Sequence, residues 1–137
     1  MKKAFLSLCF SALYMPLFAG NLVVKTTGAK GAGMVHFILF NEAEGFPGKE
    51  ESSLFTDKVV ANNGIASWHV TLPAGKPYAI AAYYDTNGNG RLDKNIFGAP
   101  TEPYGFSGNV RPRFSAPTFR QAAFKFERAG EIKIVLK

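Results

Sequence analysis

Short runs of β-branched and aromatic residues recur along the chain, separated by glycine, proline and asparagine, and this spacing constrains the fold more than any other feature. Such runs are typical of antiparallel sandwiches, in which each strand is short and ends at a turn. The sequence therefore predicts an all-β protein, an antiparallel immunoglobulin-like β-sandwich of about seven strands. The expected strands cover residues 20–26, 34–40, 54–60, 65–71, 78–84, 124–126 and 132–136.

Two pairs of these strands are expected to form hairpins. Asn62-Asn63-Gly64 separates residues 54–60 from residues 65–71, and an Asn-Gly pair accepts the positive φ angles of a hairpin turn. Ala129-Gly130 separates the last two segments and predicts a closing hairpin.

Local patterns predict the surroundings of a few single side chains. Ala66, Trp68 and Val70 alternate along one strand and share a face, so we expect Trp68 to be buried in the core. Thr118 and Gln121 have the spacing of a capping box, which predicts one helical turn after Thr118. His36 and His69 have no partner at metal-ligand spacing, and both are interpreted as structural.

An oxygen-rich loop follows the expected strand 78–84 and predicts a metal site. Side-chain oxygens occur at alternate positions, a glycine stands where the loop must turn sharply, and calcium needs six to eight oxygens. The predicted calcium ligands are the side chains of Asp85, Asn87, Asn89 and Asp93, the carbonyl of Arg91, and Glu102 returning from downstream. The twelfth position of an EF-hand loop is Ile96 here, so binding is expected to be weak. A metal-free turn rich in asparagine and glycine is the alternative.

Aromatic residues surround this loop in the sequence. They are Tyr83, Tyr84, Phe97, Tyr104 and Phe106. They are candidates for a surface that binds a sugar or another flat ligand. The alternative is a small satellite core that folds the long loop back onto the sandwich.

The first residues have the layout of a secretory signal peptide. A basic Lys2-Lys3 pair precedes an apolar stretch, and Ala19 is the expected cleavage site. Residues 1–19 are therefore assigned to a signal peptide and residues 20–137 to a single sandwich domain. We expect a periplasmic or secreted protein with no transmembrane segment after cleavage. Its one cysteine, Cys9, lies in the presequence, so the core has no disulfide.

Charge is distributed unevenly along the expected domain. Residues 20–107 carry seven basic and eight acidic side chains, whereas residues 108–137 carry seven basic and two acidic ones. The basic C-terminal part is a candidate for contact with anionic lipid or polysaccharide, and an evenly solvated surface is the alternative. Export argues against nucleic acid as a partner.

With these motifs identified, the chain resembles a bacterial family known as the domain of unknown function 2141 family. The resemblance is carried by Leu72-Pro73-Ala74-Gly75, by residues 85–93, by Phe97-Gly98-Ala99-Pro100-Thr101-Glu102 and by Tyr104-Gly105-Phe106-Ser107. It implies an exported prealbumin-like β-sandwich and implies no activity. Members of the family often carry a histidine just before the aspartate of the loop, where this chain has Tyr84.

Three functions stay open at this point. The first is an exported, non-enzymatic binding or interaction module of the cell envelope with a structural calcium loop. The second is a hydrolase acting on envelope saccharides or small molecules, although no catalytic motif identifies a nucleophile, a base or an organic cofactor. The third is a metal-free structural accessory protein. The envelope ligand or protein partner is not specified by any motif.

Overall fold

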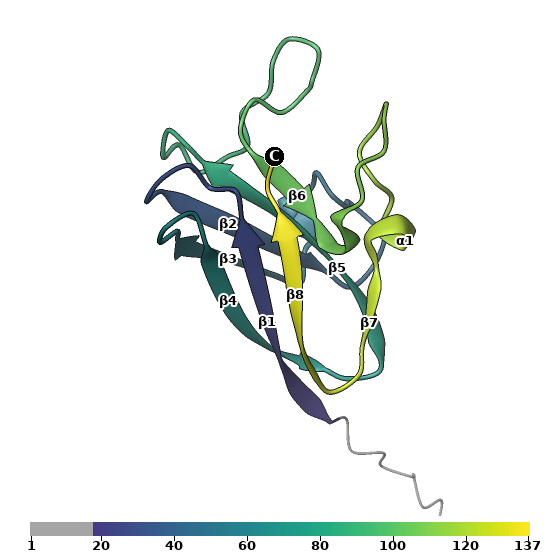
Figure 1. The fold of residues 1–137 in the computed structure, drawn as a ribbon. Helices are drawn as coiled ribbons and strands as arrows, with labels where there is room; N and C mark the ends of the chain where they lie inside the picture. Colours follow the sequence, from purple (N-terminus) through teal and green to yellow (C-terminus); the bar gives the residue numbers. More distant parts are fainter. Residues whose placement is uncertain (1–17) are drawn as a thin grey trace, which may run out of the picture.

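Eight strands in two stacked sheets form the protein (Figure 1), as described by a computed structural model of residues 18–137. The signal peptide assigned to residues 1–19 falls outside the described residues except for Phe18 and Ala19. The strands are β1 (Ala19–Thr27), β2 (Met34–Phe40), β3 (Phe55–Val60), β4 (Ala66–Pro73), β5 (Lys76–Asp85), β6 (Tyr104–Phe106), β7 (Phe124–Phe126) and β8 (Ala129–Val135). The short helices are η1 (Glu50–Ser52), η2 (Ser107–Asn109) and α1 (Phe119–Ala122).

The two sheets differ in size and in what covers them. One has three strands in the order β4-β1-β8, and the other has the order β3-β2-β5-β6 with β7 also paired to β5. Every pair is antiparallel except β1 with β8. The predicted β-sandwich is confirmed. The eighth strand is β6, a three-residue strand inside the segment that we predicted to be a long loop.

Strand β5 is buried on both of its faces from Tyr78 to its end, as its nearly continuous apolar sequence requires. Tyr78, Ile80, Ala82 and Tyr84 belong to the main core between the two sheets. The intervening residues Ala79, Ala81 and Tyr83 belong to a second apolar cluster on the outer face, which loops and α1 cover. The outer face of β5 is therefore the base on which the loops of the candidate site rest.

The first predicted hairpin is wrong, although its turn forms. Asn63 and Gly64 have positive φ angles of 51° and 79°, and Asn62 and Ile65 exchange main-chain hydrogen bonds. Beyond that point β3 pairs with β2, whereas β4 pairs with β1 in the opposite sheet. The turn carries the chain between layers, because Trp68 of β4 stacks on Phe37 of β2 across the core with 5.5 Å between ring centroids.

The predicted closing hairpin is also wrong. β7 pairs with the start of β5, and β8 runs parallel to β1 with Val24 opposite Ile132. The chain crosses between the sheets at Arg128, whose carbonyl oxygen occupies the space that a Cβ at residue 20 would need. A side chain at residue 20 would therefore clash with this crossing.

Two local predictions are confirmed. Trp68 is buried, and Thr118 and Gln121 form a reciprocal capping box at the start of α1. The Thr118 hydroxyl accepts the Gln121 N–H at 3.2 Å, and the Gln121 side chain accepts the Thr118 N–H at 2.9 Å. Within residues 18–137, no helix combines the length and the apolar character that crossing a bilayer demands.

Replacing Trp68 by alanine should destabilise the protein by about 3–5 kcal/mol, because the change removes a large side chain from a core that cannot collapse fully. Chemical denaturation measures the free energy of unfolding. Phe55→Ala on the exposed edge strand β3 is the control and should have a much smaller effect. Equal losses in the two variants would contradict the assignment of Trp68 as the core anchor.

Candidate functional site

Asp85, the last residue of β5, holds the first half of the loop that leads to β6. Its carboxylate is buried and accepts hydrogen bonds from the N–H groups of Gly88 at 2.9 Å, Asn89 at 3.2 Å and Gly90 at 2.8 Å. The φ angle of Gly90 is 79°, which confirms the predicted sharp turn at a position that disfavours a side chain. The loop is therefore wound around one carboxylate.

His36 on β2 contacts the same carboxylate from the neighbouring strand. Its Nε2 atom lies 3.3 Å from Oδ2 of Asp85, and its ring stacks on Tyr83 with 4.5 Å between centroids. The Tyr83 hydroxyl lies 3.0 Å from Nδ1 of His36 and donates to the carbonyl of Gly90 at 3.2 Å. His36 and Tyr83 are directly opposite in the β2–β5 ladder, so strand pairing creates this cluster. Sequence reasoning missed it because no local motif links residues so far apart.

The buried position of this cluster shifts the pKa of each member. Burial raises the pKa of Asp85, but hydrogen bonds from the N–H groups of Gly90 and Gly88, together with His36, outweigh it and leave this pKa below its usual value. Burial lowers the pKa of His36, with Lys58 acting in the same direction and Asp85 and Glu50 opposing it. Burial, followed by nearby carboxylates, strongly raises the pKa of Tyr83. The fold thus favours an ionised Asp85, and burial opposes a charge on His36.

Glu102 closes the loop from the other end. Its Oε1 accepts hydrogen bonds from the Thr86 N–H at 2.9 Å and the Thr86 hydroxyl at 3.0 Å, and its Oε2 accepts the Asp93 N–H at 3.0 Å. The carboxylate is buried, so these three donors replace the water it has lost. Glu102 therefore returns to the loop, as its assignment as a distal ligand requires, and its oxygens already have protein donors.

The remaining predicted metal ligands meet above Asp85. The side-chain amides of Asn87 and Asn89 donate to the Asp93 carboxylate at 2.5 Å and 2.7 Å. The amide oxygens of the same residues accept the N–H groups of Asn89 and Arg91. Among residues 18–137, no three side chains of histidine, cysteine, aspartate or glutamate lie close enough together to hold a metal ion. Any cation here would depend on amide and main-chain oxygens and would replace some of these hydrogen bonds.

The aromatic candidates separate into three environments. Tyr83, Tyr104 and Phe106 lie in or against the outer cluster on β5 and β6. Tyr84 points the other way, into the main core, where its hydroxyl accepts the N–H of Gly33 at 3.1 Å. Phe97 is exposed at the tip of the loop. The structure therefore brings three of the five aromatic side chains together.

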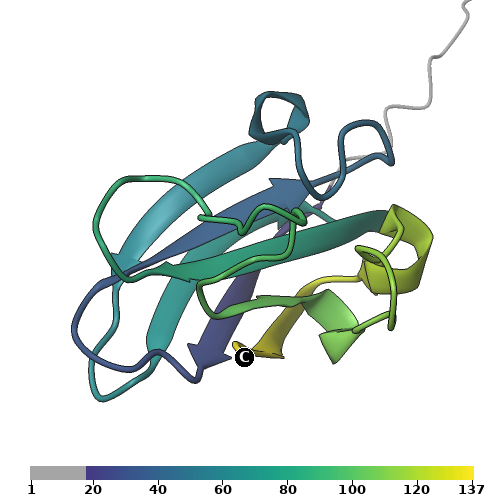
Figure 2. The ribbon, with the colours of Figure 1, turned by 90° about the horizontal axis from the view of Figure 1, so that it is seen from above.

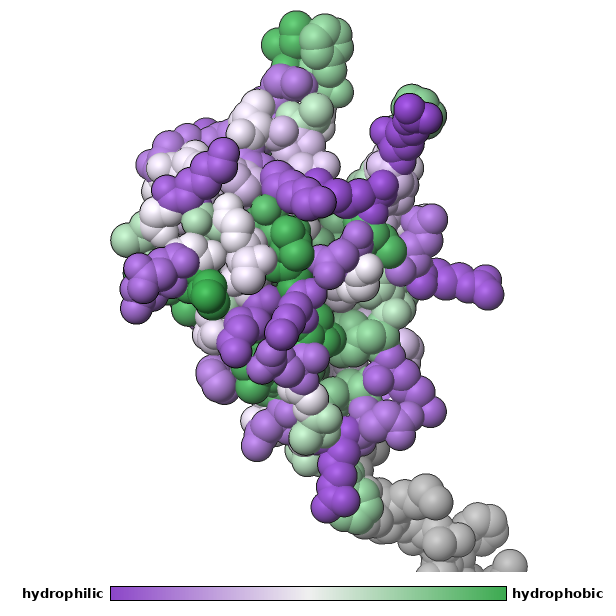
Figure 3. Space-filling model, in the orientation of Figure 1, coloured by the Kyte–Doolittle hydropathy of each residue, from purple (hydrophilic) through white to green (hydrophobic). Residues whose placement is uncertain are grey.

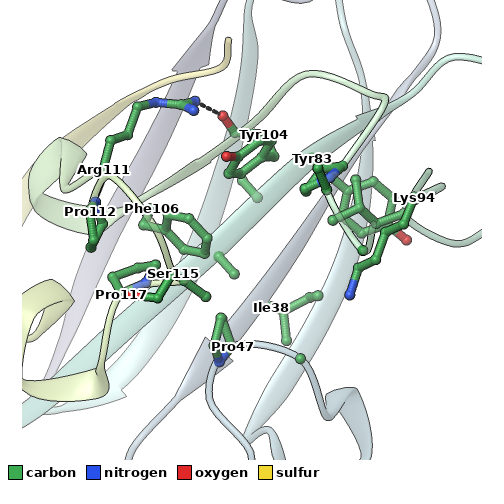
Figure 4. A pocket seen from close by; sticks show the side chains of 18 of the residues that line it. Ile38, Pro47, Tyr83, Lys94, Tyr104, Phe106, Arg111, Pro112, Ser115 and Pro117 are labelled. Carbon is green, nitrogen blue, oxygen red and sulfur yellow. Dashed lines mark hydrogen bonds between the residues drawn. The ribbon is translucent and has the colours of Figure 1, made fainter. Parts of the chain in front are cut away.

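A pocket of about 590 Å³ opens on this outer face (Figure 4). Apolar residues of β2, β5 and β6 form its floor, among them Ile38, Ala81 and Phe106. Its walls are two loop segments, residues 91–100 before β6 and residues 111–117 after η2, and Pro47, Gly48 and Glu50 from the segment after β2 also line it. The basic side chains that line it are Arg91, Lys94, Arg111 and Arg113, and the only lining carboxylate is Glu50. Sequence analysis did not predict that residues 111–117 and these four basic side chains belong to the same site as the loop.

The Arg111 side chain is fixed at the edge of this pocket. Its guanidinium carbon lies 4.5 Å from the centroid of the Tyr104 ring, and Nη2 donates to the Tyr104 carbonyl (Figure 4). Among the described residues, none of the four lining cations forms an ion pair. The pocket therefore joins an apolar floor to a lining with more positive than negative side chains.

Comparison with known protein families gives a match. The family described as "Uncharacterized protein conserved in bacteria (DUF2141)" matches residues 24–134, which include strands of both sheets and both loop segments 91–100 and 111–117. Neither the curated proteins nor the solved structures contain a match.

Acid should destabilise the fold through the His36–Asp85 cluster. Both groups have a lowered pKa in the folded protein, so the unfolded chain binds their protons more readily and stability rises with pH. The contribution of His36 is complete above about pH 6.5 and is lost as the pH falls below that value. The contribution of Asp85 is lost only in stronger acid, below about pH 4.

Urea unfolding between pH 7.5 and pH 5 measures the contribution of His36 to the pH dependence of the free energy of unfolding. His36→Phe should lower the stability at neutral pH, because it removes the contact with Asp85, and should flatten the dependence on pH. His69→Asn, at an exposed position, is the matched control and should keep the wild-type slope. A slope that is unchanged in His36→Phe would assign the acid sensitivity to another group.

Proposed function

Because the chain belongs to the bacterial DUF2141 family, for which the match assigns no activity, we propose a function from the site: an exported, non-enzymatic binding module of the cell envelope. Its ligand is a small molecule that joins an apolar body to a negatively charged group. The single observation that carries this proposal is the pocket with an apolar floor and a predominantly basic lining. The signal-peptide pattern of residues 1–19 supports export.

The floor and the lining favour different parts of such a ligand. Ile38, Ala81 and Phe106 offer apolar surface for a ring or an alkyl chain, and burial of that surface supplies affinity without specificity. Arginine presents a planar group with several donors, which suits a carboxylate, a sulfate or a phosphate. Arg111 is already held in place by Tyr104, so part of the ordering cost is met before binding.

The chemistry of the pocket favours binding over hydrolysis. Glycoside hydrolases use two carboxyl groups on either side of the bond they cleave. The pocket offers one carboxylate, that of Glu50, and Glu102 is bonded to Thr86 and Asp93 in the loop. The carboxylate of the buried Asp85 likewise accepts hydrogen bonds from three N–H groups of the loop.

Weak calcium binding is the second part of the proposal. Its ligands are Asp85, Asn87, Asn89, the Arg91 carbonyl, Asp93 and Glu102, which the loop gathers around shared hydrogen bonds. The ion competes with donors that already occupy these oxygens, so a dissociation constant of roughly 10⁻⁴–10⁻³ M is expected. The loop that holds Arg91 and Lys94 would become more rigid when calcium is bound.

Paired fluorescent probes test the pocket. Anilinonaphthalene sulfonate carries an anionic group, and phenylnaphthylamine has nearly the same rings without it. Arg91→Glu combined with Arg113→Glu should weaken binding of the sulfonate by about tenfold, because two attractive charges become repulsive. Binding of the neutral probe should change little. Fluorescence titration measures both affinities.

Lys76→Glu is the control, because Lys76 is exposed and pairs with β7 at the opposite end of β5 from the loop. It should leave both affinities unchanged. Equal weakening of both probes, or the same loss in the control, would reject the pocket as the anionic ligand site.

Thermal unfolding with and without calcium tests the metal. At about a hundred times the dissociation constant, calcium should stabilise the protein by about 2.7 kcal/mol, because it binds only the folded loop. Asp93→Ala should abolish this gain. It is a cleaner variant than Asp85→Ala, which also removes the anchor of the loop in the absence of metal. Glu44→Ala, in the exposed loop after β2, should keep the gain. If calcium stabilises Asp93→Ala and Glu44→Ala equally, the loop is not the calcium site and is only a turn.

A further inference from the structure

Two neighbouring loops end in large apolar side chains that contact almost nothing. Ile96 and Phe97 are 93% and 87% exposed at the tip of the loop before β6, and Phe114 is 94% exposed at the tip of the loop after η2. Both loops project from the same end of the sandwich (Figures 1 and 2). In Figure 3 hydrophobic surface caps one projection, whereas hydrophilic surface covers most of the other on this side, with hydrophobic surface behind it. Exposed apolar tips of this kind mark a surface that contacts a partner or a membrane.

The two tips have similar sequences. Phe97-Gly98-Ala99-Pro100 in one loop corresponds to Phe114-Ser115-Ala116-Pro117 in the other, and a basic residue, Lys94 or Arg111, lies three positions before each phenylalanine. The two tips also face one another as the walls of the pocket. The chain therefore presents the same short combination twice, side by side and exposed.

The first tip satisfies its own main-chain polar groups. The Asn95 side chain accepts hydrogen bonds from the N–H groups of Phe97 at 2.9 Å and Ala99 at 3.0 Å. In the main chain, Asn95 N–H donates to the Ala99 carbonyl at 2.9 Å and Gly98 N–H donates to the Asn95 carbonyl at 3.0 Å. A tip built in this way presents Ile96 and Phe97 in a fixed position. It also lowers the cost of entering a region poor in water, because these groups keep their partners there.

Charge identifies the kind of surface that the tips fit. Segments 94–100 and 111–117 contain three cations, Lys94, Arg111 and Arg113, and no acidic residue. None of these cations forms an ion pair within the described part of the chain. In both segments cations flank an exposed apolar side chain in the sequence, a combination that suits a bilayer surface, where anionic head groups adjoin the acyl region.

We propose that the two loops dock together on an anionic lipid bilayer. Ile96, Phe97 and Phe114 enter the boundary between head groups and acyl chains, while Lys94, Arg111 and Arg113 contact lipid phosphates. The pocket between the loops then opens toward the lipid surface. This docking goes beyond ligand binding in the pocket and does not require a bound ligand. Phe97, Phe114 and the three cations also line the pocket, and Ile96 is the docking residue outside its lining.

Vesicle flotation tests the docking. The purified protein should bind vesicles of phosphatidylcholine mixed with phosphatidylglycerol more tightly than vesicles of phosphatidylcholine alone. Ile96→Ser, Phe97→Ser and Phe114→Ser should each lower the partition into vesicles by about tenfold. Lys94→Gln should lower it by about fivefold on anionic vesicles only, and added salt should reduce that difference. All variants keep the wild-type N-terminus, so the differences report on the tips.

Phe55→Ser is the matched control. Phe55 is 45% exposed on edge strand β3, and the register places it beside Leu39, at the opposite end of the sheet from Asp85. This variant should float with the vesicles as the wild type does. If the tip variants also bind as the wild type does, or if the wild type does not bind anionic vesicles, the proposal is overturned.

A fluorescent reporter distinguishes insertion from surface contact. The only tryptophan, Trp68, is buried, so Phe114→Trp adds a second emitter at the tip of one loop. Its emission should shift to the blue on anionic vesicles and be quenched by brominated acyl chains. Absence of both changes would contradict insertion of the tips into the bilayer. Tip variants that abolish self-association in solution and leave vesicle binding intact would assign the tips to a protein interface instead.

Ile96→Ser also separates this proposal from the function proposed above. It should reduce vesicle binding and leave sulfonate-probe binding in the pocket unchanged. Arg91→Glu alone should show the reverse pattern, with weaker sulfonate-probe binding and intact vesicle binding, because Arg91 lines the pocket but lies outside both tip segments.

Discussion

The buried carboxylate of Asp85 is the interaction on which the upper part of the molecule depends. A buried charge is costly unless hydrogen bonds replace the water that it has lost. Here three N–H groups of the following loop and the imidazole of His36 surround it. The loop is thereby fixed to the end of β5. Because that loop forms one wall of the pocket, the shape of the candidate site depends on this single carboxylate.

Burial of β5 on both faces links the core to the site. The inner face of β5 packs against the other sheet, and the outer face carries a second apolar cluster with Phe40, Phe106 and Ala122. Small residues at positions 79 and 81 keep the outer face low, so the loops and α1 can cover it and leave a hollow above Ala81. The same strand thus supports stability on one side and forms the floor of a pocket on the other.

The loops above this strand divide their polar and apolar groups between two tasks. Main-chain N–H groups of the loop donate hydrogen bonds to the side-chain oxygens of Asn87, Asn89, Asn95 and Glu102, and these bonds give the loop a defined shape. Ile96, Phe97 and Phe114 contribute almost nothing to the core, although burying them would stabilise the protein. Internal packing does not explain the exposure of these three side chains, whereas the proposed contact with a lipid surface does.

The sequence alone determined the all-β class, the burial of Trp68, the capping box at Thr118 and the turns at Gly64 and Gly90, because each depends on neighbouring residues. Only the tertiary structure decided which strands pair. Residues 62–65 turn tightly, yet β3 and β4 join different sheets so that Trp68 can meet Phe37. His36 and Tyr83 are 47 residues apart and meet through the β2–β5 ladder. Such long-range register depends on packing between layers, which no local pattern encodes.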